Sequence, residues 1–298
     1  MQNLRVDRPR DALPRSRMTG SGVVAHMGAG GESKMEKPNI PRGESRRILG
    51  VDFYTGDVDG AIDRLSSGGL LVVPSAPSLK DMVSNESYRQ ALVNADLAIP
   101  DSAFMVLLWN WLQRDSLIRL SGLKYLRQLL LQADVRTPGN TFWVMAGPAS
   151  ARKNLQWLAS SGIVVPENCI YEAPMYDGEI EDRALIERLR DLHVKHIVIT
   201  IGGGTQERLG LFVKRNLKYR PAIHCIGAAI AFLSGDQVNI PDWADRFYLG
   251  WLFRCVSVPA RYVPRYWSAV KLFPLLWRYR DKLPPIQAVT PAGARTEA

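Results

Sequence analysis

The sequence has few cysteines and histidines, and none at the spacings that build metal sites or disulfide frameworks. Its three cysteines, Cys169, Cys225 and Cys255, lie far apart and form no CxxC pair, and its four histidines add no metal-binding spacing. An odd number of widely spaced cysteines argues against a disulfide-stabilised domain and against a zinc site. We therefore expect a protein of the reducing cytoplasm that needs no metal or other cofactor.

Long apolar runs are also missing. No run approaches the roughly 20 apolar residues that a helix needs to cross a bilayer. The N-terminal segment carries arginines but lacks the apolar stretch of a signal peptide. If this protein meets a membrane, we expect it to lie on the surface.

What the chain does contain is enough apolar sequence for a substantial core. Of its 298 residues, 46% are hydrophobic, whereas disorder requires low hydrophobicity together with high net charge. The formal net charge of +9 favours anionic partners, which include nucleic acid, acidic lipid headgroups and phosphorylated substrates.

Composition divides the chain into four segments. Residues 1–47 are rich in Arg, Gly, Pro and Ser without apolar periodicity, which predicts a disordered basic tail. Residues 48–239 form the predicted core. Residues 240–282 form an aromatic and basic appendage, and the polar residues 283–298 are predicted to be a second disordered tail.

Short apolar segments alternate with amphipathic helix patterns through the predicted core. The segments LLVVPSA, TFWVMAG and VKHIVITIGGG are predicted strands, and a helix pattern follows each. This alternation predicts an α/β fold with a Rossmann-like, mainly parallel sheet and helices on both faces. Right-handed crossovers then bring the carboxyl ends of the parallel strands to one edge, where ligands bind.

Asp101 follows a short predicted strand that ends at Pro100. Proline stops the strand, so Asp101 should lie at the ligand edge. A carboxylate there can accept the proton of an attacking hydroxyl as a general base. The alternative is that Asp101 caps the apolar helix that begins after it.

Arg119 precedes a Ser-Gly pair in a basic connection. Its guanidinium offers bidentate donors of the kind that bind a diphosphate leaving group. A solvated surface arginine is the alternative.

Three glycines, Gly202 to Gly204, separate the predicted strand VKHIVITI from the helix that begins with Thr205-Gln206-Glu207. Glycines let backbone N–H groups approach a phosphate, and a helix N-terminus adds a favourable dipole. A plain turn explains the run as well. The run does not match the GxGxxG motif of dinucleotide-binding proteins. The next predicted strand ends at Gly227 and lacks the acidic residue that binds a ribose. An NAD-type oxidoreductase is therefore the less favoured alternative.

The appendage interleaves aromatic residues with arginines and lysines. Such a pattern predicts amphipathic helices whose aromatic side chains enter the lipid interface while the cations meet anionic headgroups. Packing against the core and nucleic-acid binding through base stacking are the alternatives.

Several of these segments resemble one known family. LVNADLAIPDS resembles the strand ADLVLPDG of the WecG/TagA/CpsF glycosyltransferases, RLSGLKYL resembles RVxGxDL, and IVITIGGGTQE resembles ILFVGLGSPKQE. IGAAIAFLSG and the appendage resemble VGAAFDFLAG and the family's aromatic–basic C-terminus. The ordered set covers about residues 48–280.

The resemblance implies inverting transfer of a hexose or N-acetylhexosamine from a UDP-sugar to a polyprenyl-diphosphate-linked acceptor, in cell-surface or exopolysaccharide synthesis. It implies a peripheral enzyme on the inner face of the cell membrane, with an anionic membrane surface rather than nucleic acid as partner; a homo-oligomer stays open. Asp101 is the implied base, with Arg119 beside the diphosphate as the second catalytic residue. The other implied binding residues are Ser75, Gly202, Gly204, Gln206, Glu207, Arg254, Arg261 and Arg265.

The chain also departs from the family at polar positions expected to touch the donor sugar. The Thr-x-Asn after the second strand is Pro74-Ser75-Ala76, the acid of FDF is Ala231, and SPK is Gly203-Gly204-Thr205. Ser75 partly replaces the missing threonine. A UDP-hexose such as UDP-glucose therefore fits at least as well as UDP-N-acetylmannosamine, and a catalytically inactive membrane scaffold is a further alternative.

Overall fold

The computed structural model describes residues 45–235 and 250–287, except for the side chains of Trp251, Phe253, Arg254 and Arg261. These residues belong to one unit, Pro38–Ala298. The predicted N-terminal tail up to residue 44, the first ten residues of the predicted appendage and residues 288–298 lie outside this part.

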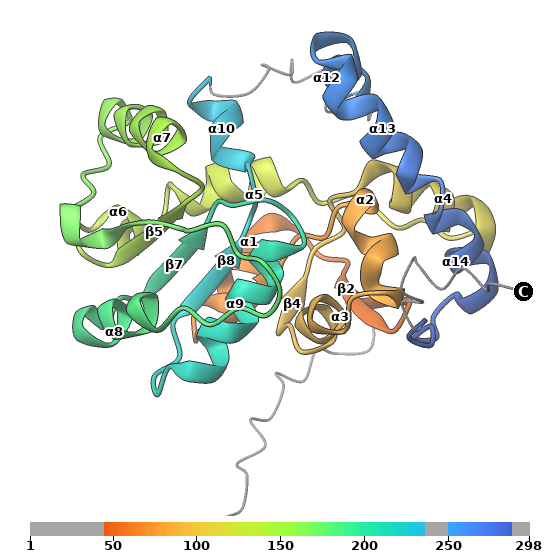
Figure 1. Cartoon of the computed structure of the whole chain (residues 1–298), viewed down its shortest axis with the longest axis horizontal. Helices are drawn as coiled ribbons and strands as arrows, with labels where there is room; N and C mark the ends of the chain where they lie inside the picture. Colours follow the sequence, from red (N-terminus) through yellow and green to blue (C-terminus); the bar gives the residue numbers. More distant parts are fainter. Residues whose placement is uncertain (1–44, 236–249, 288–298) are drawn as a thin grey trace, which may run out of the picture. The chain divides into compact units, whose positions relative to one another are not determined.

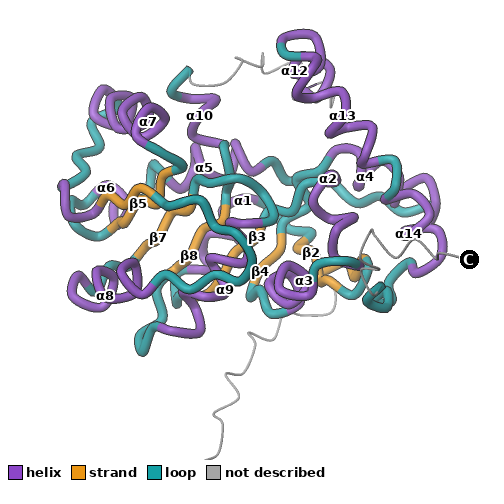
Figure 2. Tube along the Cα trace, viewed as in Figure 1, coloured by secondary structure: helices purple, strands orange, loops and turns teal. Residues whose placement is uncertain are grey.

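One eight-stranded sheet forms the centre of the described chain, in the order β1-β2-β4-β3-β8-β7-β5-β6 (Figure 2). β1 pairs antiparallel with β2, and every other neighbouring pair is parallel. The strands are Ser45–Ile48, Val51–Tyr54, Gly69–Val72, Leu97–Ala98, Thr141–Met145, Ile170–Glu172, His196–Ile199 and Ala222–Cys225, numbered β1 to β8 in chain order. The predicted α/β class with a mainly parallel sheet is confirmed.

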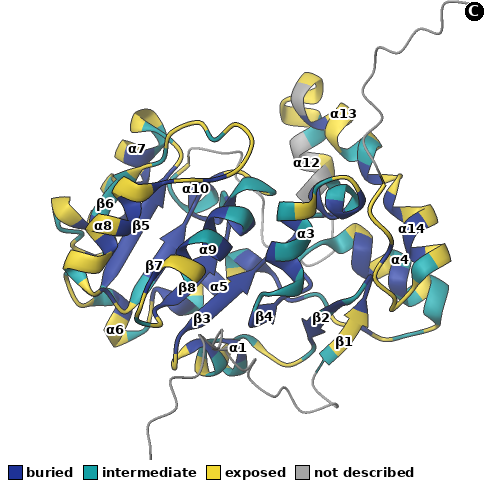
Figure 3. Cartoon of the chain, turned by 60° about the horizontal axis from the view of Figure 1, so that its bottom comes forward, coloured by how far each residue is buried: buried dark blue, intermediate teal, exposed yellow. Residues whose placement is uncertain are grey.

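Both faces of the sheet are buried, as the period-2 alternation of strand side chains shows. In β3, Leu70 and Val72 belong to one apolar cluster, whereas Leu71 and Val73 at its end belong to the other. Figure 3 shows the central strands buried along their length. Burial on both faces is typical of parallel sheets that helices cover on each side.

Each apolar cluster has its own set of helices. One contains residues of α3 (Glu86–Val93), α4 (Ala103–Gln113), α8 (Arg183–Leu192) and α9 (Thr205–Asn216). The other contains residues of α1 (Val58–Leu65), α5 (Gly122–Leu129), α7 (Pro148–Ser160) and α10 (Ala229–Leu233). The remaining elements of the core are α2 (Ala76–Leu79), η1 (Lys80–Val83), α6 (Ala133–Arg136) and η2 (Glu167–Cys169).

Residues 250–287 of the described chain contain three further helices, coloured blue in Figure 1: α12 (Gly250–Ser257), α13 (Pro259–Ala269) and α14 (Leu272–Tyr279). α13 contacts α2, and α14 contacts α2 and α4. Leu272 and Leu276 are fully buried and belong to the same apolar cluster as α3 and α9. Packing against the core, one of the three alternatives for this stretch, therefore holds for the inner face of α14.

Residues 283–287, which we assigned to the second tail, are tied to the core. Arg89 Nη1 donates to the Pro284 carbonyl at 2.6 Å, and the backbone N–H of Gln287 donates to the Val83 carbonyl at 2.7 Å. Buried backbone groups need partners, and these contacts supply them. In the described residues, no helix is both long and apolar enough to span a bilayer.

Candidate active site

The carboxyl ends of four neighbouring strands carry several of the predicted site residues. β4, β3, β8 and β7 lie side by side in that order. Asp101 follows β4, Ser75 follows β3, Gly227 follows β8, and the three glycines follow β7. Because these strands are parallel, segments more than 100 residues apart in sequence meet at one edge of the sheet, where α/β proteins bind their ligands.

Asp101 and Arg119 form a pair at this edge. Asp101 Oδ1 accepts from Arg119 Nη2 at 2.9 Å, and Arg119 Nε donates to the Asp101 carbonyl at 2.5 Å. Arg119 is mostly buried, with 14% of its side chain exposed, whereas 32% of the Asp101 side chain is exposed. The guanidinium therefore fixes both the backbone and the side chain of Asp101.

The first amide of α5 holds the same carboxylate oxygen. The Gly122 N–H donates to Asp101 Oδ1 at 3.1 Å. In the part of the chain that the structure describes, no hydrogen bond to Asp101 Oδ2 is found. One oxygen is thus anchored, and the other has no hydrogen-bond partner among the described residues, an arrangement compatible with a general base.

The structure excludes the alternative that Asp101 caps the helix after it. Ser102 is the N-cap of α4, and its hydroxyl accepts from the Met105 N–H at 3.3 Å. Serine is a preferred N-cap residue. The Asp101 carboxylate therefore does not cap α4 and instead accepts from the Gly122 N–H of α5.

Ser75 lies at the start of α2, beside the glycine turn. Its hydroxyl shares a hydrogen bond of 3.0 Å with the Ser78 hydroxyl. A β-carbon on Gly203 would lie 3.1 Å from Ser78 Oγ and 3.8 Å from Ser75 Oγ. The turn after β7 and the two serines after β3 are therefore neighbours. Ser78 was not among the residues predicted for the site, although its spacing of three residues from Ser75 was a signal.

Gln206 and Glu207, two predicted binding residues, lie beneath the glycine turn rather than on it. Both are buried, with exposures of 2% and 0%. Glu207 accepts from the Gly204 N–H at 2.7 Å and from Gln206 Nε2 at 3.0 Å. Burial raises the pKa of Glu207 to about 7. Their side chains therefore bind backbone N–H groups of the turns at Gly204 and Gly227. The glycine turn itself is exposed at Gly202 and Gly203.

The three predicted arginines of the C-terminal stretch are not brought to this edge by any described contact. Arg265 is an exposed residue of α13. Arg254 and Arg261 belong to α12 and α13, but their side chains lie outside the described part. Within the described residues, no group of three or more His, Cys, Asp or Glu side chains has the geometry of a metal site.

Gly204 has a backbone conformation that only glycine adopts readily, with φ of +90° and ψ of −51°. We expect Gly204→Ala to lower the free energy of unfolding by about 1–3 kcal/mol, because a β-carbon is strained there. Gly202→Ala is the matched control, since its β-carbon meets nothing within 4 Å and should change stability by less than about 0.5 kcal/mol. Urea denaturation of both variants measures the difference, and equal stabilities would contradict the strain argument.

Comparison with known proteins agrees with this geometry. The family described as "Glycosyl transferase WecG/TagA/CpsF family" matches residues 46–285. A relative from Bacillus spizizenii, N-acetylglucosaminyldiphosphoundecaprenol N-acetyl-beta-D-mannosaminyltransferase, is 21% identical over 244 residues, covering 76% of this chain and 91% of the relative. The family match covers the described sheet from the second residue of β1 onward and the C-terminal helices, and it replaces the oxidoreductase alternative. The chain therefore belongs to the WecG/TagA/CpsF family of glycosyltransferases.

Proposed function

We propose that this enzyme moves a hexose or N-acetylhexosamine from a UDP-sugar to a polyprenyl-diphosphate-linked acceptor, with inversion at the anomeric carbon. The observation that carries the proposal is the anchored Asp101 carboxylate, whose Oδ1 meets Arg119 and the Gly122 N–H at the edge where α/β folds bind ligands. The name of the relative from Bacillus, whose acceptor is a diphosphoundecaprenol glycan, supports the acceptor class.

The chemistry follows from this placement. An acceptor hydroxyl gives its proton to Asp101 Oδ2 while its oxygen bonds to the anomeric carbon. The bond from that carbon to the UDP oxygen breaks on the opposite face, and UDP leaves with the bonding electrons. Arg119 places a positive charge at the same edge, and we propose that it also stabilises the departing diphosphate. Preorganised charge of this kind is often the largest catalytic contribution.

The donor sugar is the open part of the proposal. The Ser75–Ser78 hydroxyl pair beside the glycine turn is the polar group that we assign to the sugar, in place of the family's threonine. We expect UDP-glucose to be used at least as well as UDP-N-acetylmannosamine.

A UDP-release assay tests the function. The purified chain is mixed with UDP-glucose, UDP-galactose, UDP-N-acetylglucosamine or UDP-N-acetylmannosamine, each with and without a short-chain polyprenyl-diphosphate glycan. We expect acceptor-dependent UDP release with at least one donor. Absence of release with every donor, from protein that binds anionic vesicles, would favour the inactive membrane scaffold.

We further propose that the enzyme works at the inner face of the cell membrane. Aromatic rings extend from α4 to α14, where Trp111 and Phe273 have centroids 6.3 Å apart and Phe273 and Trp277 have centroids 6.2 Å apart. Trp267 on α13 is 78% exposed. Large exposed aromatic surfaces mark interaction sites.

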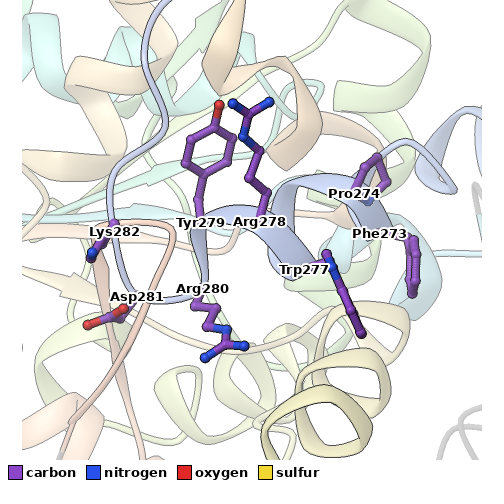
Figure 4. A pocket seen from close by; sticks show the side chains of 8 residues that line it. All are labelled: Phe273, Pro274, Trp277, Arg278, Tyr279, Arg280, Asp281 and Lys282. Carbon is purple, nitrogen blue, oxygen red and sulfur yellow. The ribbon is translucent and has the colours of Figure 1, made fainter.

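Cations surround these rings. A hollow of about 870 Å³ at the end of α14 is shown in Figure 4 and is lined by Phe273, Pro274, Trp277, Arg278, Tyr279, Arg280, Asp281 and Lys282. Aromatic rings at headgroup depth with nearby arginine and lysine are typical of helices that lie in a lipid interface.

Replacing Trp267 and Trp277 together with serine should weaken binding to vesicles that contain anionic lipid. Each tryptophan that leaves the interface costs about 1.5–3 kcal/mol of apolar burial, so the partition coefficient should fall by at least about tenfold. Met175→Ser is the control, because Met175 is 92% exposed on the loop before α8 and should have no effect. Vesicle sedimentation gives the coefficients, and unchanged binding of the double variant would exclude this surface.

A further inference from the structure

A chain of three hydrogen bonds, two buried and one partly buried, links the turns that follow β7 and β8. Glu207 Oε2 accepts from the Gly204 N–H, and Glu207 Oε1 accepts from Gln206 Nε2. Gln206 Oε1 in turn accepts from the Gly227 N–H at 2.5 Å. Through these three bonds, one carboxylate connects two turns that belong to different strands.

The chain needs a residue with two acceptor oxygens at position 207. The donors from Gly204 and Gln206 each require one oxygen, and a carboxylate supplies both, whereas a glutamine supplies one. Glu207 also fixes the Gln206 amide. With Nε2 directed at Glu207, Oε1 is the atom that faces the Gly227 N–H.

The surroundings of Glu207 make its charge sensitive to pH near neutrality. Among the described residues, Tyr88 of α3 and Cys225 of β8 are titratable groups near Glu207, and its charge contributes to raising the pKa of each. Burial raises the pKa of both, so they stay neutral near pH 7. The pKa of Glu207 is about 7, and Glu207 is therefore the member of this cluster that changes charge in that range.

Ionising a carboxylate away from water is unfavourable, so a gain in folding stability does not by itself explain why Glu207 is buried. The hydrogen bonds of Glu207 and Gln206 instead hold the two turns at the carboxyl ends of β7 and β8. The turn it holds at Gly204 adjoins the Ser75–Ser78 pair through Gly203. The turn at Gly227 lies at the end of β8, between β3 and β7.

We propose that Glu207 is a positioning residue for the nucleotide donor, holding the turns after β7 and β8, through Gly204 and Gln206, in the shape that binds the diphosphate of a UDP-sugar. This inference rests on the proposed function. It assigns Glu207 no contact with the substrate, in place of the direct binding role expected from the sequence.

Glu207→Gln tests the inference, because it preserves the side-chain shape and removes one acceptor. We expect KM for the UDP-sugar to rise about tenfold, the usual effect of losing a hydrogen bond to a charged group, with kcat at saturating donor within about threefold of the wild type. Glu207→Ala should raise KM further. Asp182→Asn is the control, since Asp182 is a buried carboxylate bound to Tyr171 and Tyr176 at the start of α8; it should lower stability and leave KM unchanged.

The pH profile separates positioning from a purely structural role. The ionised carboxylate accepts both donors, so kcat/KM of the wild type should fall as pH drops below about 7 and level off about tenfold lower, the loss expected for Glu207→Gln. The free energy of unfolding should depend on pH in the opposite direction. Because the folded pKa lies above the ordinary value of 4.5 for a glutamate, the stabilisation from this group is complete below about pH 4.5 and is lost as pH rises through about 7.

In Glu207→Gln, both pH dependences should disappear. UDP-sugars suit the assay because their diphosphate carries no group that titrates near neutrality. If wild-type protein releases UDP but Glu207→Gln keeps the wild-type KM and pH profile, the inference is wrong. If Glu207→Gln does not fold, a flat wild-type profile between about pH 6 and 8.5 would overturn the inference. Wild-type protein that uses no UDP-sugar would instead contradict the proposed function.

Discussion

Asp101→Asn should lower kcat by about 10²–10⁴-fold, the range expected when a general base is removed. Asparagine retains the shape of the side chain and an oxygen that can accept from the Gly122 N–H and Arg119, which hold Asp101 in the structure. It has no basic oxygen to take the hydroxyl proton. The loss should therefore appear in kcat, while KM for the UDP-sugar changes by less than about threefold. Steady-state UDP release at saturating acceptor measures both.

The control for this variant is Asp52→Asn. Asp52 of β2 also forms a salt bridge with an arginine, Arg47 of β1, but 43% and 59% of the two side chains are exposed. Its replacement should leave kcat unchanged, because exposed ion pairs contribute little. If Asp101→Asn keeps kcat within about tenfold of the wild type, Asp101 is not the base.

Arg119→Ala is expected to lower kcat/KM by about 10²–10³-fold, the usual effect of removing a preorganised donor that stabilises developing charge. The variant removes the bonds that orient Asp101 and a positive charge at the edge where the diphosphate departs. Arg119→Lys retains the charge but cannot bond Asp101 through two nitrogens in a fixed plane. It should recover only part of the loss.

Arg46→Ala is the matched control for Arg119. Arg46 on β1 forms an ion pair with Asp115 at 2.6 Å, and 47% of the Arg46 side chain is exposed. Steady-state kinetics of Arg119→Ala, Arg119→Lys and Arg46→Ala under identical conditions separate the effect of the positive charge from that of the bonds to Asp101. Full activity of Arg119→Lys would show that charge alone is sufficient, and full activity of Arg119→Ala would exclude a catalytic role.

The sequence predicted the positions of the chemical groups along the strands. Pro100 marks the end of β4, and three successive glycines mark the turn after β7. Both are local signals of backbone conformation, and in a parallel sheet the carboxyl ends of the strands necessarily share an edge. The edge and two of its loops could therefore be identified before any contact was known.

Contacts between these groups could not be predicted in the same way. Asp101 and Arg119 are 18 residues apart and meet because α4 turns the chain back before α5 begins. Asp101 and Ser102 are both good N-cap residues, and packing decides which of them caps α4. Likewise, nothing local distinguishes a Gln-Glu pair that faces a ligand from one that packs against Tyr88 and Cys225.

The C-terminal stretch shows a different limit of sequence analysis. Its density of aromatic and basic residues predicted a separate appendage. However, Leu272, Leu275 and Leu276 follow the i, i+3, i+4 spacing of a helix face that packs on the core, and all three are buried. Deleting residues 240–298 would therefore remove part of the core together with any lipid-binding surface, which is why replacing the exposed Trp267 and Trp277 is the better test.

The anomeric configuration of the product tests the central claim most directly. A single base that activates the acceptor hydroxyl leads to displacement of UDP in one step, with inversion at the anomeric carbon, as in reactions where a carboxylate activates an attacking oxygen. Proton NMR of the product formed from an α-linked UDP-sugar should show a β-linkage. An α-linked product would contradict a one-step displacement with Asp101 as its base.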